Sequence, residues 1–134
     1  MKAAWLGICA AFLAGCAGLA LPPPKRIAAI VTEYRHNSHA DVIVGRLVES
    51  HTLDGKGEFP DLELVSLYTD QVPANDTSRV LMKQYGVRIY DNIEDALTEG
   101  TGKLAVDGVL LVAEHGKYPR NETGNEIWPK RRMF

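Results

Sequence analysis

Apolar and polar residues alternate in blocks between residues 26 and 115, and the spacing within each block predicts its secondary structure. An unbroken apolar run at residues 27–31 is typical of a strand that is buried on both faces of a parallel sheet. A polar turn follows, and Ser38 with Asp41 then has the spacing of a capping box at a helix start. Behind this cap, apolar residues recur at helical spacing and predict one buried face: Ala40, Ile43, Val44, Leu47 and Val48.

Three further apolar runs predict strands at residues 62–68, 87–90 and 108–113. The last run is the most apolar, so we expect it to lie at the centre of the sheet. Because helical segments separate the strands, the strands should pair in parallel through right-handed crossovers. The pattern predicts an α/β fold: a Rossmann-like three-layer domain over residues 26–134 with a parallel sheet of four strands in the order 3-2-1-4. We expect this domain to be incomplete at the C-terminus, because only one turn of a fourth helix precedes Phe134.

Two helices are predicted between the second, third and fourth strands. Asn75 or Asp76 is expected to cap the first, which should end at Gly86, a residue suited to the left-handed position that follows many helices. Asn92 is expected to cap the second, which should end near residue 100. The residues expected to face the sheet from these helices are Val80, Leu81, Tyr85, Ile93, Ala96 and Leu97.

Composition and charge narrow the class of partner. The length of 134 residues fits one domain, and the net charge of −2 gives no reason to expect nucleic acid as a partner. The triplet at residues 130–132 is the basic cluster of the chain, and we expect it to be a solvated helix start. A small-molecule ligand is the predicted partner.

The N-terminal segment has the features of an export signal. Residues 1–15 combine one lysine with a long apolar stretch, which is typical of a secretory signal peptide. The sequence L-A-G-C that ends at Cys16 resembles the lipobox of bacterial lipoproteins, which implies lipid attachment at Cys16. Residues 16–25 would then form a proline-rich tether to the membrane on the periplasmic side. Two alternatives stay open: residues 3–21 are an uncleaved anchor, or the start codon is misassigned.

Four motifs resemble the N-terminal nucleotide-binding domain of the Gfo/Idh/MocA family (glucose–fructose oxidoreductase and inositol dehydrogenase). They are K-R-I-A-A-I-V, L-V-S-L-Y-T-D, Y-G-V-R-I-Y-D-N-I-E-D-A-L and D-G-V-L-L-V-A-E-H, and the resemblance covers residues 26–115. It implies an oxidoreductase of a divergent exported branch, with NAD or NADP as its cofactor. The family's lysine and substrate domain have no counterpart before Phe134, so we expect the chain alone to be inactive. A missing C-terminal domain or a second copy of the chain would complete it.

The first turn departs from the family pattern. Dinucleotide-binding members usually carry G-x-G-x-x-G there, because glycine lets the backbone approach the pyrophosphate. This chain has T-E-Y-R-H-N-S-H, and Glu33 would place a carboxylate where the diphosphate lies. Arg35 could supply positive charge instead. The alternative function is therefore a lipid-anchored, non-enzymatic module that binds a small ligand such as a sugar.

The candidate ligand-binding residues lie where the predicted strands end. They are Thr32, Glu33, Ser38, His39, Asp70, Glu114 and His115. Asp70 ends the second strand, where Rossmann domains place an acid on ribose hydroxyls, although an ordinary turn also explains it.

The other candidates lie at the first helix and after the fourth strand. Ser38 and His39 could donate to a phosphate at the helix start, although capping alone explains Ser38. Glu114 and His115 are placed for acid–base or cofactor contact, or form a surface pair. No catalytic residue is assigned. We expect no metal site, because His36 and His39 lack an evident third ligand beyond Asp41 or Glu33.

Overall fold

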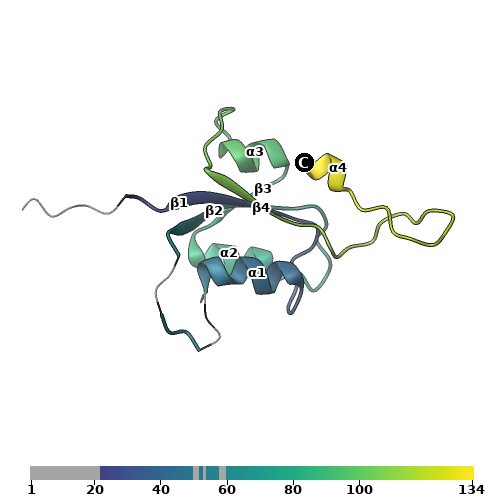
Figure 1. Cartoon of the computed structure of the whole chain (residues 1–134), viewed down its shortest axis with the longest axis horizontal. Coiled ribbons are helices and arrows are strands. Elements are labelled where there is room, and N and C mark those ends of the chain that lie inside the picture. The colour runs from purple at the N-terminus through teal and green to yellow at the C-terminus, as the bar shows by residue number, and fades with distance from the viewer. Residues whose placement is uncertain (1–21, 50–51, 53, 58–59) are drawn as a thin grey trace, which may run out of the picture.

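The computed structural model describes residues 22–49, 52, 54–57 and 60–134, which contain a four-stranded parallel sheet with helices on both faces (Figure 1). The elements are β1 (Lys25–Val31), α1 (His39–Val48), β2 (Leu62–Thr69), α2 (Ser78–Tyr85), β3 (Arg88–Tyr90), α3 (Ile93–Thr98), β4 (Gly108–Val112) and α4 (Lys130–Met133). The strands are arranged in the order β3-β2-β1-β4, and each neighbouring pair is parallel. The predicted α/β class and strand order are therefore confirmed, and they are consistent with a Rossmann-like fold.

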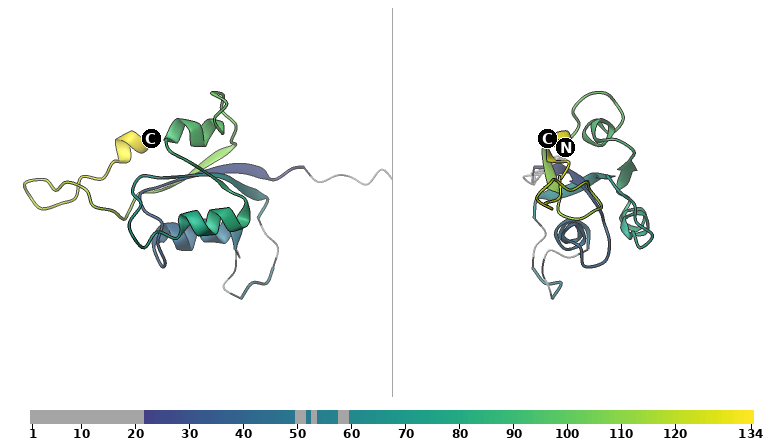
Figure 2. Two further views of the ribbon diagram at one scale, coloured as in Figure 1. Left: turned by 180° about the vertical axis from the view of Figure 1, so that it is seen from behind. Right: turned by 90° about the vertical axis from the view of Figure 1, so that its right-hand side faces the viewer.

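The helices form one layer on each side of the sheet. Figures 1 and 2 show α1 and α2 on one side and α3 and α4 on the other. Alternate residues of β1 supply the two cores, because successive side chains of a strand point to opposite faces. Ala29 and Val31 pack in the α1/α2 core, whereas Ile30 packs with Ala96 of α3 and Met133 of α4.

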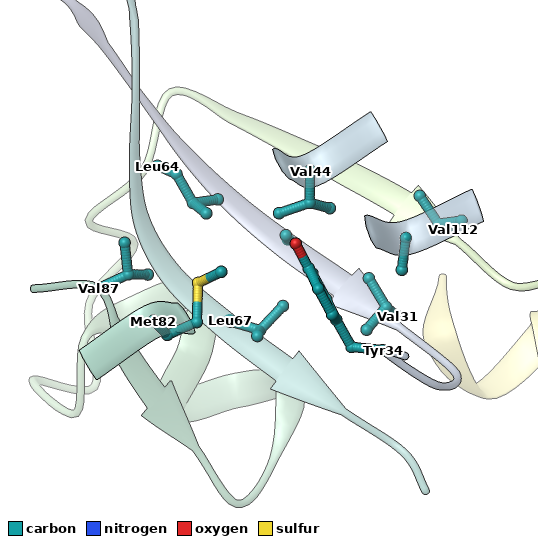
Figure 3. Close-up of a cluster of buried hydrophobic side chains, with 10 residues drawn as sticks. Val31, Tyr34, Val44, Leu64, Leu67, Met82, Val87 and Val112 are labelled. Carbon is teal, nitrogen blue, oxygen red and sulfur yellow. The ribbon is translucent and has the colours of Figure 1, made fainter. Parts of the chain in front are cut away.

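The larger core lies between the sheet and helices α1 and α2 (Figure 3). It contains Leu67 of β2, Val44 of α1 and Met82 of α2, each completely buried. Tyr34, in the turn after β1, is also completely buried, and its hydroxyl has no hydrogen-bond partner among the described residues. Burial, with a smaller effect from nearby carboxylates, raises the pKa of Tyr34 above its ordinary value. The turn after β1 is thus part of the core, which fixes the backbone that carries its neighbours Glu33 and Arg35.

Local signals predicted three of the helix boundaries. The Ser38 Oγ accepts a hydrogen bond from the Asp41 amide at 3.2 Å, and the Asn92 side chain accepts one from the Asp95 amide at 2.7 Å. Gly86 has a φ of 72° at the end of α2, a left-handed conformation that glycine adopts without strain. These three predictions are confirmed.

The prediction for α2 was only partly right, both at its start and on its buried face. The N-cap position is Thr77, which makes no side-chain cap hydrogen bond, but the Asp76 carboxylate accepts a hydrogen bond from the Arg79 amide at 3.4 Å. Leu81 packs against the core as predicted, whereas Val80 is 74% exposed. Ser78 and Met82 are the buried residues, and Val80 lies two positions from each. Two positions correspond to about 200° around a helix, so Val80 points to solvent. Tyr85, the last residue of α2, is exposed as well.

Two further predictions about apolar residues were wrong. β4 lies at an edge of the sheet rather than at its centre, and its Val109 is 51% exposed. The residues of β1 and β2 are the most buried, because these strands have neighbours on both sides. Ile43 of α1 is exposed as well, since α1 contacts β2 and β4 through its other apolar residues.

Within the described ranges, no helix combines the length and apolar character needed to cross a bilayer. The predicted signal peptide at residues 1–15 and the predicted lipid attachment at Cys16 lie outside the described residues.

Candidate ligand site at the carboxyl edge of the sheet

The carboxyl ends of β1 and β4 are joined by hydrogen bonds that bring four of the predicted residues together. The Thr32 amide donates to the Val112 carbonyl at 3.1 Å, and the His115 amide donates to Thr32 Oγ1 at 3.2 Å. Thr32 is almost completely buried. Thr32 therefore links the end of β1 to the segment after β4 and holds Glu33 near Glu114 and His115.

Glu33, Arg35 and His115 form a polar chain across this edge. The Arg35 Nε donates to Glu33 Oε2 at 3.3 Å, and Arg35 Nη2 lies 3.5 Å from His115 Nδ1. The side chain of Glu33 is only 11% exposed, whereas that of Arg35 is about a third exposed. A buried carboxylate needs such a partner, because desolvation of an unpaired charge is costly. The guanidinium keeps further N–H groups that can donate to a ligand.

His39, at the start of α1, extends the cluster toward solvent. Its Nδ1 lies 2.5 Å from Glu114 Oε2, and its ring stacks on that of His115 with a centroid separation of 4.9 Å. The side chains of His39 and Glu114 are more than half exposed. This pair is accessible, so its ionic contribution to stability is small.

The start of α1 already has acidic partners. The Ser38 hydroxyl is buried and accepts from the amides of Arg35 and Asp41, and Asp41 Oδ2 accepts from the Asn37 amide at 2.8 Å. Asn37 has a φ of 60°, which lets the chain turn sharply into the helix. A carboxylate in the first turn stabilises the positive end of the helix dipole. The cap thus already uses the Asp41 amide, and the Asp41 carboxylate would repel a phosphate at this end of the helix.

A hollow of about 350 Å³ opens at this edge, within the range of about 300–1,000 Å³ that is usual for ligand pockets. Its lining residues are Glu33, Arg35, Glu114, His115, Gly116, Lys117, Glu126 and Trp128. Three of these carry a carboxylate and two carry a permanent positive charge. The wall thus has both signs of charge and one indole ring.

Five lining residues were not among the predicted ligand-binding residues. Arg35 was suggested only as a source of charge, and the other four belong to the segment after β4. One signal was present in the sequence: residues 114–128 are polar and follow the carboxyl end of a strand, where ligands of open α/β sheets bind. The fold of that segment, which sets what faces the hollow, could not be read from it.

Asp70 lies apart from this cluster, on the α3/α4 side of the sheet. Its carboxylate accepts hydrogen bonds from the hydroxyls of Tyr68 and Tyr118, each at 2.8 Å, and from Arg132 Nη2 at 2.6 Å. Burial opposes ionisation of this group, but the three hydrogen bonds outweigh it, so the pKa of Asp70 lies below its ordinary value. The structure therefore brings together Thr32, Glu33, Ser38, His39, Glu114 and His115, but not Asp70.

The described part of the chain has no group of three or more His, Cys, Asp or Glu residues arranged to hold a metal ion. Comparison of the chain with protein-family models, with curated proteins and with solved structures found no match. The resemblance to the Gfo/Idh/MocA family therefore stays a prediction from the four motifs.

Proposed function

We propose that this chain is the nucleotide-binding-type domain of an exported oxidoreductase related to the Gfo/Idh/MocA family, and that it holds NAD or NADP at the carboxyl edge of its sheet. One observation carries the proposal: the hollow opens at the carboxyl ends of β1 and β4, beside the start of α1. In the strand order β3-β2-β1-β4 this is the point where the chain direction across the sheet reverses, which is where open α/β sheets bind ligands.

In this proposal the domain contributes binding and orientation. Arg35 and Lys117 donate hydrogen bonds to anionic or carbonyl oxygens of the ligand, and the Glu33 carboxylate accepts hydrogen bonds from its hydroxyls. Trp128 offers an apolar ring face to a sugar or base. No residue of this chain is assigned to hydride transfer.

A second candidate is a binding module for a neutral polyhydroxy ligand such as a sugar. The observation that favours it is the side chain of Glu33, which lies in the first turn with little exposure and lines the hollow. A diphosphate in this position would be repelled by Glu33 and Glu114, whereas hydroxyl groups would donate to them. Glycine, which would let a diphosphate approach the backbone, is absent from residues 32–39.

Calorimetric titration of the chain and its Glu33→Gln variant separates the two candidates. The probes are NAD⁺, NADP⁺, glucose and myo-inositol. If a dinucleotide binds, loss of the Glu33 charge should strengthen its binding several-fold, to about tenfold; if a sugar binds, the same change should weaken it about tenfold. Glu122→Gln, in an exposed turn that does not line the hollow, is the matched control and should change neither. Absence of saturable heat with all four probes would remove both candidates.

We also propose that the chain is exported and lipid-anchored through Cys16. The support is the L-A-G-C motif behind an apolar stretch. Expression of the full chain in a bacterium, followed by radioactive palmitate labelling, tests this. Cys16→Ser should abolish labelling and Cys9→Ser should preserve it, whereas equal labelling of both variants would refute the proposal.

A further inference from the structure

The Asp70 carboxylate accepts three side-chain hydrogen bonds, and its partners come from three separate parts of the chain. Tyr68 belongs to β2, Tyr118 to the segment after β4, and Arg132 to α4. The Asp70 side chain is only 7% exposed, and both of its oxygens accept a hydrogen bond. Little acceptor capacity is left for an external ligand.

The two distant partners lie at the two ends of one segment. We call residues 116–133 the strap; in Figure 1 it leaves the end of β4, projects beyond the sheet and returns to α4 beside α3. Tyr118 holds its outgoing end and Arg132 its returning end on the same carboxylate. The Asp70 side chain thus links both ends of the strap to the end of β2.

Further contacts position the rest of the strap. The Lys117 amide donates to the Gln71 side chain at 3.0 Å, and the Gln71 amide group donates back to the Lys117 carbonyl at 3.1 Å. The ring of Tyr118 packs against that of Trp128 with centroids 5.4 Å apart. Further along, the Ile127 amide donates to the Pro119 carbonyl at 2.8 Å. Trp128 is therefore positioned through Tyr118, whose hydroxyl is fixed by Asp70.

The strap supplies half of the lining of the hollow. Gly116, Lys117, Glu126 and Trp128 belong to it, and the other four lining residues come from the β1 and β4 edge. The conformation at Gly116 is a further constraint, because its φ is 137° and an added Cβ would lie 2.5 Å from the Tyr118 ring. The shape of the hollow depends on where the strap is fastened.

We infer that Asp70 is a positioning residue that fastens the strap over the candidate site and does not itself contact the ligand. The lowered pKa of Asp70 supports this inference, because the carboxylate is held in the charged form that accepts all three hydrogen bonds. The expected contribution of Asp70 to ligand affinity rests on the proposed function. Its expected contribution to the position of the strap does not depend on any ligand.

The test compares Asp70→Asn with the unaltered chain by amide hydrogen exchange. Asparagine keeps one acceptor oxygen but loses the charge, so the hydrogen bonds from Tyr118 and Arg132 cannot both be retained at full strength. Exchange in residues 117–128 should become at least about tenfold faster, while β1 and β2 stay protected. Asp91→Asn, an exposed residue after β3, is the matched control and should leave the strap unchanged.

Trp128 fluorescence gives a second readout. Trp5→Phe in the full chain leaves Trp128 as its single tryptophan, and Asp70→Asn should then shift the emission to longer wavelength as the indole meets water. If Asp70→Asn fails to fold, Arg132→Gln removes one donor only, with its neighbour Arg131→Gln as control. The Arg132 variant should accelerate exchange in the strap and the Arg131 variant should not.

The affinity readout separates the inference from the sequence-based prediction that Asp70 contacts ribose. A positioning role predicts that Asp70→Asn weakens every ligand of the hollow and loosens the strap without any ligand present. Unchanged exchange in the strap, with weaker binding of NAD⁺ or NADP⁺ alone, would overturn the inference in favour of direct contact. If none of the probes binds to the unaltered chain, the proposed function fails, and the exchange experiment still decides the role of Asp70.

Discussion

Two polar clusters lie at the same edge of the sheet, and they differ in how much of their hydrogen-bonding capacity is already used. The Glu33–Arg35–His115 cluster has contacts of 3.3 and 3.5 Å and is open to solvent through Arg35. The Asp70 cluster has contacts of 2.6 to 2.8 Å and a buried carboxylate at its centre. We therefore expect the first cluster to exchange its contacts for those of a ligand, and we expect Asp70 to hold the chain together instead.

The largest effect expected from this difference is on stability. Asp70→Ala removes the shared acceptor and leaves two tyrosine hydroxyls and Arg132 without it, which should lower the free energy of unfolding by about 3 kcal/mol. Glu33→Gln keeps an acceptor for Arg35 and should change the free energy of unfolding by less than about 1 kcal/mol. Urea denaturation followed by circular dichroism measures both. Equal losses in the two variants would remove the distinction between the clusters.

The pH dependence of stability should depend on the same carboxylate. The pKa of Asp70 is lower in the folded chain than its ordinary value, so the folded state favours the charged form. Its contribution to stability is complete above the ordinary pKa of about 3.9 and is lost as the pH falls through the lower, folded-state value. Asp70→Asn should therefore flatten the stability profile below about pH 4. A parallel downward shift of the whole profile would contradict this assignment.

Substitution of the two neighbouring arginines of α4 should give a smaller difference in the free energy of unfolding. Arg132 donates to Asp70 and Arg131 is exposed. Arg132→Gln should cost about 1 kcal/mol and Arg131→Gln less than about 0.5 kcal/mol, measured by the same denaturation. If the two variants were indistinguishable, the link between α4 and Asp70 would contribute nothing measurable to the fold.

The smallest effect is expected at the outer part of the open cluster. His39→Ala removes the exposed contact with Glu114 and the ring stacking on His115, and should change the free energy of unfolding by less than about 0.5 kcal/mol. Thermal denaturation at low and high salt measures this. A large loss would show that the open cluster is structural as well.

The sequence predicted best those features that depend on residues close together along the chain. The caps Ser38 and Asn92 and the terminating Gly86 each act within one helical turn, and all three are confirmed. The strand order also followed, because strands that alternate with helices have few possible arrangements. Of the residues predicted to face the sheet from α2, Leu81 packs against the core, whereas Val80 and Tyr85 are exposed. The buried face includes the polar Ser78 beside Met82, so apolar spacing alone did not predict it.

The sequence predicted only those lining residues of the candidate site that closely follow a strand. The order of the strands brings Glu33, Glu114 and His115 to one edge, and this is visible in the sequence once β1 and β4 are placed. Two of the three partners of Asp70, Tyr118 and Arg132, are 48 and 62 residues away along the chain. Tyr118 lies in a segment without regular structure and Arg132 in a single helical turn. No periodicity predicts such contacts, so Asp70 received a role by analogy with its position in the fold.

Amide chemical-shift mapping by NMR tests the central claim, that the hollow between β1, β4 and the strap is the ligand site, most directly. Titration of the ¹⁵N-labelled chain with NAD⁺, NADP⁺, glucose or myo-inositol should shift the amides of Glu33, His115 and Lys117 and the indole signal of Trp128 in a saturable manner. Saturable shifts confined to other parts of the sheet, or no shifts with any of the four probes, would contradict the account.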